Sequence, residues 1–492
     1  MDQMQMSPAK SKSDAEHLEA LGYKATFERS MTLWENFSLG FTYLSPVVGV
    51  YSVFALAMST AGPPMIWWYV IAGCGQMLVC LIFGEIASEF PIAGGLYPWG
   101  RRLVGKRWSW MVGWIYAWAL FTTIAGVAVG AGPFLASLLG FTSSPFITTA
   151  IALILVLTAT ALNLAGTKLL ARVAMFGFVC EILGALAVGS YLFLFARHQS
   201  LGVIVNSFGI NRDGSYAFPF LAAALAGLYT CYGFEACADV AEETSSPETQ
   251  IPVAMRRTIY IGISASIFVC LALILALPDI QGVIHGQNAD PIGTILRGAF
   301  GTVGSRLVLG VVLVSFISCI LSLQAAASRL LFSCARDNMI FGSTQLSKLS
   351  TRNVPSVALA IAGLIPAFIV CIGYFLQDAL ATIVSFAVAG IYISFQMIVA
   401  GALYARSTGW KPSGPFKIGR FATLINILAL TYGVCAIADI LWPQSTAGPW
   451  YLNYSIPFTT AIVIATGALY IVIGRPYKID NVPPASAISD IR

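Results

Sequence analysis

Long apolar runs separated by short polar stretches dominate the pattern of this 492-residue chain. Each run is close to the roughly 20 apolar residues that a helix needs to cross about 30 Å of hydrocarbon. A hydrophobic content of 58%, a charged content of 10% and a mean hydropathy of +0.80 exclude an ordinary soluble domain and a disordered chain. The pattern predicts an all-α integral membrane protein with twelve transmembrane helices, at residues 34–58, 65–88, 108–138, 146–165, 172–196, 218–240, 257–277, 306–331, 355–375, 379–404, 421–442 and 453–474.

Two of these spans are interrupted in the middle of the membrane. The first contains Ser45, Pro46, Val47, Val48 and Gly49, and the sixth contains Tyr232, Gly233, Phe234 and Glu235. In hydrocarbon every backbone N–H and C=O group needs an internal partner, so a broken helix is tolerated only where it lines a cavity. Interrupted spans at matching positions of two halves are the best sequence pointer to the binding site of a transporter. We therefore expect a substrate pathway between the two breaks.

The spacing of the breaks, five spans apart, predicts two structural repeats. Spans one to five fall in residues 31–197, and spans six to ten fall in residues 213–405. Because five is an odd number, the second repeat enters the membrane from the opposite side, which produces inverted symmetry. The last two spans, in residues 418–475, are an addition to this five-plus-five arrangement.

Positive charge predicts the orientation. With a cytoplasmic N-terminus, all but four of the 27 Lys and Arg residues fall on the cytoplasmic side, the exceptions being Arg197, Arg212, Arg297 and Arg306. The net charge of +5 is thus mostly a mark of topology in a lipid bilayer and does not indicate nucleic-acid binding. Residues 1–30, which have no apolar run before Met31, and residues 476–492 are interpreted as cytoplasmic tails of a protein of the plasma or inner membrane.

Glu235 and Glu181 are the acidic residues that lie well inside the predicted spans, and such residues are functional candidates by default. Glu235, in the sixth break, could bind a substrate amine or carry a proton; alternatively it satisfies N–H groups freed by the break. Glu181, midway along the fifth span, has no basic neighbour in sequence and could carry a proton or bind a cation. Its alternative role is that of a neutral acid bonded to an adjacent helix. Asp439 lies near the outer end of its span, where a charge is ordinary.

The first break also offers backbone groups and nearby polar side chains. The amides that begin the half-helix after the break carry a positive partial charge and suit a carboxylate, although a proline kink without a ligand is the simpler alternative. Tyr51, Tyr232 and Phe234 could present a face to a cationic group, or could only pack. Ser315 and Ser318 of the eighth span could complete an ion site with carbonyl groups of the first break, or could bond their own helix.

Enzyme and metal chemistry find little support in the pattern. The three histidines, His17, His198 and His285, lie outside the predicted spans; nine of the ten cysteines lie inside them and Cys334 lies just beyond the eighth, without metal-ligand spacing. No nucleophile, base and orienting group can be assembled from the span residues. We expect a non-enzyme without cofactor or bound metal.

Three motifs resemble those of the amino acid–polyamine–organocation superfamily. Residues 83–97 (FGEIASEFPIAGGLY) are similar to its second-span signature, and residues 233–244 with Ile251, Pro252 and Arg257 are similar to its sixth span and the following loop. Residues 414–420 (GPFKIGR) with Ile425 and Asn426 resemble the amino acid/choline transporter branch. The resemblance covers residues 30–475.

The resemblance implies a five-plus-five inverted-repeat fold and secondary transport, by alternating access and often with protons, of amino acids, γ-aminobutyrate, choline or similar amines. It places the substrate's carboxylate at Ser45 to Val50 and its amine at Tyr232 to Glu235. Two residues depart from the superfamily pattern: Pro46 begins a break where many members have Gly-x-Gly, and Glu181 replaces a lysine that occupies an ion site in some relatives. Proton coupling through Glu181 and Glu235 is our expectation, while sodium coupling, exchange, polyamine transport and a channel or sensor role stay open.

Overall fold

The computed structural model describes residues 8–211, 214–375, 379–442 and 450–478. Within these ranges the fold is helical, and the only β-type pairing is an isolated bridge between Met31 and Thr244. Eleven helical stretches of the described chain are long and apolar enough to cross a membrane. The predicted sixth span is not among them, because non-helical residues divide it into short pieces. An all-α membrane fold is therefore confirmed, and the sixth segment is broken into shorter pieces than the first, which is interrupted only at Ser45.

The helices follow the predicted spans closely. The part that precedes the sixth segment contains α1 (Pro8–Ala20), α2 (Leu33–Leu44), α3 (Pro46–Ala61), η1 (Pro63–Ile66), α4 (Trp67–Glu89), α5 (Leu96–Leu103), α6 (Lys106–Leu139), α7 (Pro145–Leu164), α8 (Thr167–Phe195) and η2 (Leu201–Val205). The next part contains α9 (Ala217–Ala222), α10 (Ala224–Thr230), α11 (Ala236–Asp239), η3 (Ala241–Glu243), α12 (Pro247–Ala276), α13 (Ile280–Ile284), α14 (Pro291–Arg336), α15 (Ser343–Leu346), α16 (Ser356–Gly373) and α17 (Ala379–Ser407). The chain then forms η4 (Gly419–Phe421), α18 (Ala422–Leu441), α19 (Trp450–Asn453), α20 (Ser455–Gly474) and η5 (Pro476–Lys478).

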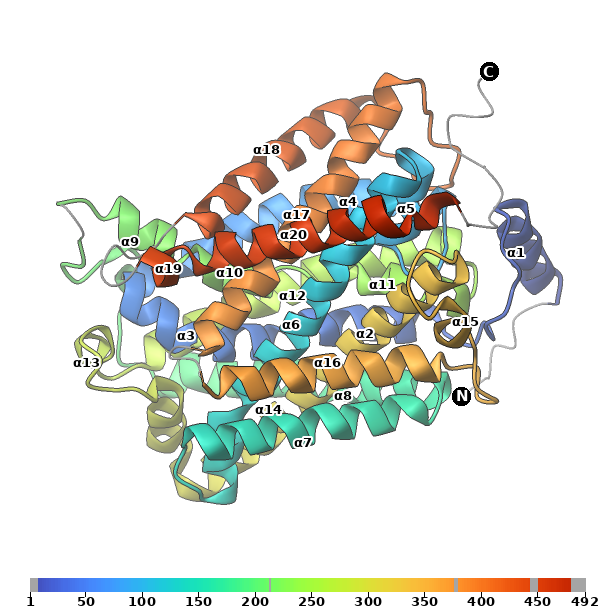
Figure 1. Ribbon diagram of the computed structural model, residues 1–492. Helices are drawn as coiled ribbons and strands as arrows, with labels where there is room; N and C mark the ends of the chain where they lie inside the picture. Colours follow the sequence, from blue (N-terminus) through green and yellow to red (C-terminus); the bar gives the residue numbers. More distant parts are fainter. Residues whose placement is uncertain (1–7, 212–213, 376–378, 443–449, 479–492) are drawn as a thin grey trace.

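The long helices form a bundle around α6 (Figure 1). Helix α6 packs against α17, α14, α7 and α16, and in the view of Figure 1 it runs between a lower group with α7, α8 and α16 and an upper group with α18 and α20. Helices α1, α5 and α15 lie at one end of the bundle, and α9, α13 and α19 lie at the other. The two broken segments are in contact with each other through α3 and α10.

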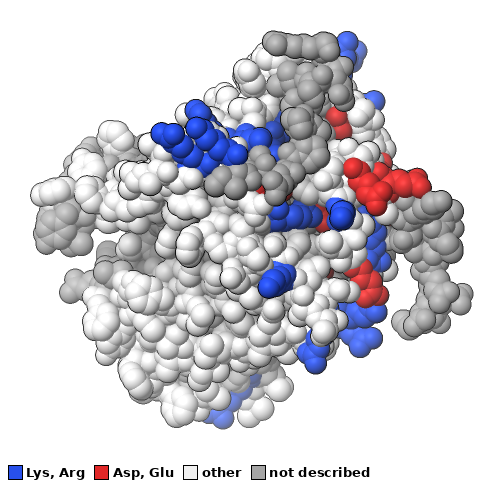
Figure 2. Space-filling model, turned by 45° about the vertical axis from the view of Figure 1, so that its right-hand side comes forward, with Lys and Arg blue, Asp and Glu red and all other residues white. Residues whose placement is uncertain are grey.

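Charged side chains gather at the end of the bundle that carries α1, α5 and α15, which we call the charged end. Figure 2 shows Lys, Arg, Asp and Glu toward its right-hand side, while the left of that face is almost entirely uncharged. Several of the charges at this end are buried rather than superficial, for example Glu243, Arg329 and Asp337. The N-terminal segment also packs here through the buried side chains of Leu18 and Tyr23, so part of the predicted tail is folded onto the bundle.

A short helix begins after Asp290, in the loop between the predicted seventh and eighth spans. Asp290 caps it by accepting a hydrogen bond from the Gly293 amide at 2.9 Å. The helix then runs into the predicted eighth span as one element, α14, with a kink at Gly301, whose φ of +65° is favoured by glycine. Another short helix of this loop, α13, begins at Ile280 and was not predicted.

Candidate substrate site

The first break is a single residue wide. Helix α2 ends at Leu44, Ser45 adopts a left-handed conformation with φ of +41°, and α3 begins at Pro46. Proline has no N–H to donate and disfavours a helical conformation in the residue before it, which explains why the helix stops here. Val47 to Val50, predicted as part of the interruption, belong instead to the first turns of α3.

A carboxylate from another helix caps this break. Glu181 of α8 accepts a hydrogen bond from the Ser45 hydroxyl at 2.8 Å and from the Val47 amide at 2.9 Å, through the same oxygen, Oε1. A carboxylate at the N-terminal end of a helix is favoured because the first amides have no intrahelical partner and carry a positive partial charge. Glu181 is fully buried, and its second oxygen, Oε2, has no hydrogen-bond partner among the described residues.

The sixth break is wider than the first, and its capping carboxylate belongs to the break itself. Helix α10 ends at Thr230, residues 231–235 are not helical, and α11 resumes at Ala236. Gly233 has φ of +119°, a conformation that side chains other than hydrogen disfavour. Its amide donates a hydrogen bond of 2.8 Å to Glu235 Oε2, only two residues along the chain. Glu235 therefore satisfies a freed backbone N–H group, and its role toward a substrate amine or a proton stays a prediction.

Each break packs against the other through a glycine. A Cβ atom added to Gly49 would lie 2.5 Å from Thr230 Cγ2, and one added to Gly233 would lie 2.6 Å from the backbone nitrogen of Leu44. Neither position has room for a larger residue, so glycine allows the first and sixth segments to approach this closely.

A small cavity lies between the two breaks. Its walls come from α2, α3, α6, α10 with the sixth break, and α14, and they consist of Tyr43, Leu44, Val48, Gly49, Thr123, Val127, Tyr229, Tyr232 and Cys319. The rings of Tyr43 and Tyr229 each stand edge-on to Tyr232, with centroids 6.2 Å apart. The hydroxyl group of Tyr229 is buried without a hydrogen-bond partner among the described residues, and that of Tyr43 is buried beside the Glu235 carboxyl group. Buried polar groups are normally paired, so the Tyr229 hydroxyl is a group that a polar ligand in the cavity could satisfy.

The predicted site residues are thus divided between the cavity and its surroundings. Val48, Gly49 and Tyr232 line the cavity, whereas Ser45, Pro46, Val47, Val50, Gly233, Phe234 and Glu235 do not. Phe234 packs between Phe83 and Phe395, with ring centroids 5.9 Å and 5.7 Å away, so it presents no face to this cavity.

The predicted ion-site serines lie near Glu181 but bond mainly to their own helix. Ser318 donates to the Val314 carbonyl at 2.9 Å, and Ser315 is within 3.4 Å of the Val311 carbonyl. Ser315 also lies against the Glu181 carboxyl group. The structure therefore brings Glu181, Ser45 and Ser315 together at the first break.

Several cavity residues could not be found from the sequence. Thr123 and Val127 lie in α6 and Cys319 lies in α14, both regular helices without any interruption at these positions. Tyr229 directly precedes the last residue of α10, just before the sixth break, and its position beside Tyr232 was the one available signal. Only the packing of α6 and α14 against the breaks identifies the other three.

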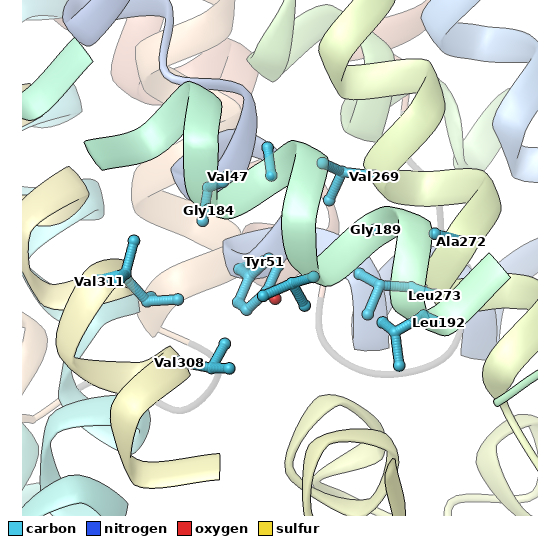
Figure 3. Close-up of a pocket in the computed structure, with 13 residues that line it drawn as sticks. Val47, Tyr51, Gly184, Gly189, Leu192, Val269, Ala272, Leu273, Val308 and Val311 are labelled. Carbon is cyan, nitrogen blue, oxygen red and sulfur yellow. The ribbon is translucent and has the colours of Figure 1, made fainter. Parts of the chain in front are cut away.

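A second pocket, of about 400 Å³, lies on the opposite side of α3 (Figure 3). Tyr51 and Val47 face it from α3, and the rest of the lining comes from α8, α12 and α14 as aliphatic side chains and glycines, among them Gly184, Leu273 and Val311. No charged side chain lines it. Such a lining suits an apolar group and offers little to a small polar substrate.

Buried ion pairs join α14 to the sixth segment at the charged end of the bundle. Arg329 donates to Glu243 at 2.8 and 3.1 Å, and Arg336 donates to Glu242 at 2.8 Å. Glu243 and Glu242 follow the sixth segment directly in η3, so these pairs connect the broken segment to α14. These acids could not be identified from the sequence, because an acid in a buried ion pair and an acid at the membrane interface look the same in it.

Asp337 extends these contacts to the N-terminal segment. It accepts hydrogen bonds from Tyr23 at 3.2 Å and Tyr97 at 3.0 Å and pairs with Arg101 at 3.2 Å. Burial raises the pKa of Asp337, while Arg101 and Arg336 act to lower it. Tyr23 thereby ties the predicted tail to the end of α14.

The second-span motif and the 410–418 loop belong to one structural unit. Glu85 pairs with Arg406 and accepts the Ile418 amide at 3.0 Å. Ser88 accepts the Phe416 amide at 2.9 Å. Two of the three motifs on which the resemblance rests are therefore in contact at the charged end.

Comparisons with known proteins agree with this architecture. Residues 32–466 match the family described as amino acid permease. Amino-acid permease BAT1 of Arabidopsis thaliana is 26% identical over 487 residues, which cover 92% of this chain and 93% of the relative. The amino-acid permease BAT1 homolog of Oryza sativa subsp. japonica is 24% identical over 490 residues, covering 93% and 92%, and amino-acid permease 2 of Neurospora crassa is 24% identical over 497 residues, covering 96% and 90%.

Proposed function

This chain belongs to the amino acid permease family, and we propose that it is a secondary transporter that moves a small amino acid or related amine by alternating access, coupled to protons. It is a membrane transporter rather than an enzyme. The observation that supports the proposal is the cavity between the two breaks, lined by Tyr43, Tyr229 and Tyr232.

The cavity suits the amine end of a substrate. The last carbonyl groups of α10 have no intrahelical partner and carry a negative partial charge, which favours a cation. Tyr43, Tyr229 and Tyr232 add aromatic faces, which also attract a cation. No carboxylate lines the cavity, so we assign the recognition of the amine to backbone carbonyls and tyrosines, with Glu235 holding the break in shape behind them.

The first break supports a role for Glu181 in coupling. Its Oε1 atom already accepts hydrogen bonds from the Ser45 hydroxyl and the Val47 amide, and its Oε2 atom is buried. A proton on Glu181 would weaken these charge-assisted bonds and change how firmly α8 holds the break. In this proposal H⁺ is the coupled ion, with Na⁺ as the alternative at the same carboxylate.

The buried ion pairs support alternating access with the charged end closed in this conformation. Opening that end toward the cavity requires separation of Arg329 from Glu243 and of Arg336 from Glu242. We place the charged end on the cytoplasmic side of the plasma or inner membrane, with both chain ends there, because it collects most of the Lys and Arg.

One observation favours a second candidate, an amine without a carboxylate such as choline or a polyamine. The first amides of α3 are already engaged, Val47 by Glu181 and Val48 by Ser45 Oγ. The substrate's carboxylate would have to displace these bonds, whereas choline needs none of them. γ-Aminobutyrate, and exchange rather than symport, also fit the cavity.

A thermal-shift panel on the purified protein separates these candidates. A ligand at about 100 times its dissociation constant adds roughly 2.7 kcal/mol to the stability of the folded state. Stabilisation by α-amino acids supports the permease proposal. Stabilisation by choline or polyamines alone supports the second candidate, and no stabilisation by any member of the panel counts against both.

A further inference from the structure

A second buried carboxylate lies one turn beyond Glu235. Asp239 ends α11 and is fully buried, as is Glu235. The hydroxyl group of Tyr116, in α6, lies 3.4 Å from Glu235 Oε1 and 3.2 Å from Asp239 Oδ2. One tyrosine hydroxyl therefore bridges two carboxyl groups inside the bundle.

The hydrogen-bond geometry favours a proton at this bridge, with the Tyr43 hydroxyl as a further neighbour of Glu235 and Tyr116. A tyrosine hydroxyl has one hydrogen to donate, so it can donate to only one of two carboxylates. If both carboxyl groups were ionised, the other contact would bring two lone pairs together in a buried site. A proton on Glu235 or Asp239 removes the conflict, because that acid donates to the Tyr116 oxygen while Tyr116 donates to the other acid.

No neighbouring basic side chain of the described residues neutralises Glu235 or Asp239 directly. Among the described residues neither Glu235 nor Asp239 forms an ion pair, and the nearby guanidinium of Arg329 is already bound to Glu243. Asp239 Oδ1 has no hydrogen-bond partner and faces Gly95, where an added Cβ would lie 2.8 Å away. The titratable and charged groups near the pair come from every element packed around it: Tyr43 of α2, Cys80 of α4, Tyr116 of α6, Tyr232 of the sixth break, Cys237 of α11, Arg329 of α14 and Tyr392 of α17.

We propose that Tyr116 relays a proton between Glu235, beside the substrate cavity, and Asp239, at the charged end. In the step toward Asp239, the Glu235 carboxyl O–H bond breaks and its proton bonds to the Tyr116 oxygen. At the same time the Tyr116 O–H bond breaks and its proton bonds to Asp239, leaving Glu235 ionised and Asp239 neutral. The relay rests on the proton coupling of the proposed function and specifies its path.

The positions of the two acids give the relay a direction across the bundle. Tyr43 lines the cavity and also lies close to Glu235. On the other side, the Asp239 carbonyl accepts the Gly94 amide at 3.1 Å, so Asp239 lies directly under the loop that joins α4 to α5. Only this loop separates a proton on Asp239 from the charged end. Asp239 also lies near Arg329, which is paired with Glu243.

The test is Tyr116→Phe, which removes the bridging hydroxyl and keeps the ring. Purified protein in liposomes is given a mixture of protein amino acids, γ-aminobutyrate and choline, and proton uptake is followed with an entrapped pH dye. We expect substrate-driven proton uptake to fall by roughly a hundredfold, the lower end of what a positioned proton-transfer group contributes. A second assay measures counterflow, in which labelled substrates outside the liposomes exchange with unlabelled substrates inside. Because this exchange needs no net proton movement, we expect counterflow to fall less than proton uptake in Tyr116→Phe. Tyr432→Phe is the matched control, since it removes a buried hydroxyl that bonds Tyr392 and no carboxylate.

Proton uptake by Tyr116→Phe equal to that of wild type overturns the relay and leaves the proposed function standing. Wild-type protein that counterflows substrate without proton uptake overturns both the relay and the proposed coupling. If Tyr116→Phe does not fold, infrared spectra of the wild type and of Asp239→Asn decide. The relay requires a buried protonated carboxyl signal in the wild type that Asp239→Asn alters, and its absence contradicts the relay.

Discussion

The first and sixth segments are both interrupted, but they satisfy the freed backbone groups in different ways. In the first segment the interruption is one residue, Ser45, and the capping carboxylate comes from Glu181 on α8. In the sixth it covers residues 231–235, and the capping carboxylate, Glu235, lies within the interruption itself. A change of protonation at Glu181 therefore affects the contact between two helices, whereas a change at Glu235 affects the local shape of one segment.

The second oxygen of each carboxyl group also has different surroundings. Glu181 Oε2 has no hydrogen-bond partner among the described residues, while Glu235 Oε1 lies 3.4 Å from the Tyr116 hydroxyl. We therefore assign Glu181 to the coupling of ion occupancy with the position of the first break, and Glu235 to the shape of the substrate site and the proton path.

Gly233→Ala should have the largest effect, because it removes the close approach of the two breaks. The added methyl group would meet the Leu44 backbone at 2.6 Å, and φ of +119° is unfavourable for alanine. We expect a loss of about 3 kcal/mol in stability and no transport. Thermal unfolding and uptake measure both.

Gly298→Ala is the matched control for this substitution. Gly298 lies in α14 with no neighbour within 4 Å of an added Cβ, so the change should stabilise the protein by up to about 1 kcal/mol. Equal stability of the two variants would contradict the packing of the breaks described above.

Glu235→Gln should lower uptake by roughly a hundredfold while the protein stays folded. Glutamine keeps an acceptor for the Gly233 amide but cannot release a proton to Tyr116. Uptake in liposomes is the measurement, with thermal unfolding as the check on folding. Wild-type uptake would remove Glu235 from the mechanism.

Glu181→Gln should have a smaller effect on downhill flux and a specific effect on coupling. The amide oxygen can still accept from Ser45 and Val47, but it cannot gain or lose a proton. We expect accumulation against a gradient to disappear while equilibration continues. Accumulation that still follows the imposed proton gradient would exclude Glu181 as the coupling site.

Ser45→Ala and Ser45→Gly should have the smallest effects and differ from each other. Both remove the hydrogen bond to Glu181, which is worth about 1.5–3 kcal/mol for a charged acceptor. Glycine accepts the left-handed backbone at +41° more easily than alanine, by roughly 1–2 kcal/mol. Thermal unfolding should therefore rank wild type first, then Ser45→Gly, then Ser45→Ala; the reverse order of the two variants would indicate that Ser45 is not strained.

The sequence predicted the helical class, the span positions and both breaks because these depend on apolar run length and on local proline and glycine. It did not predict which break residues face the substrate, since that depends on the packing of α6 and α14 through Thr123, Val127 and Cys319. It also gave no sign that Asp239, Glu242 and Glu243 are buried. Their burial arises from partners more than 80 residues away, such as Arg329 for Glu243, and no local pattern contains that information.

The most direct test of substrate binding between the breaks is solute counterflow in liposomes with Val127→Trp, which fills the cavity from α6. Val129→Trp, on the same helix but outside the cavity lining, is the control. We expect counterflow of an amino acid or amine in the wild type and in Val129→Trp and none in folded Val127→Trp. Counterflow that survives in Val127→Trp would show that the substrate passes elsewhere.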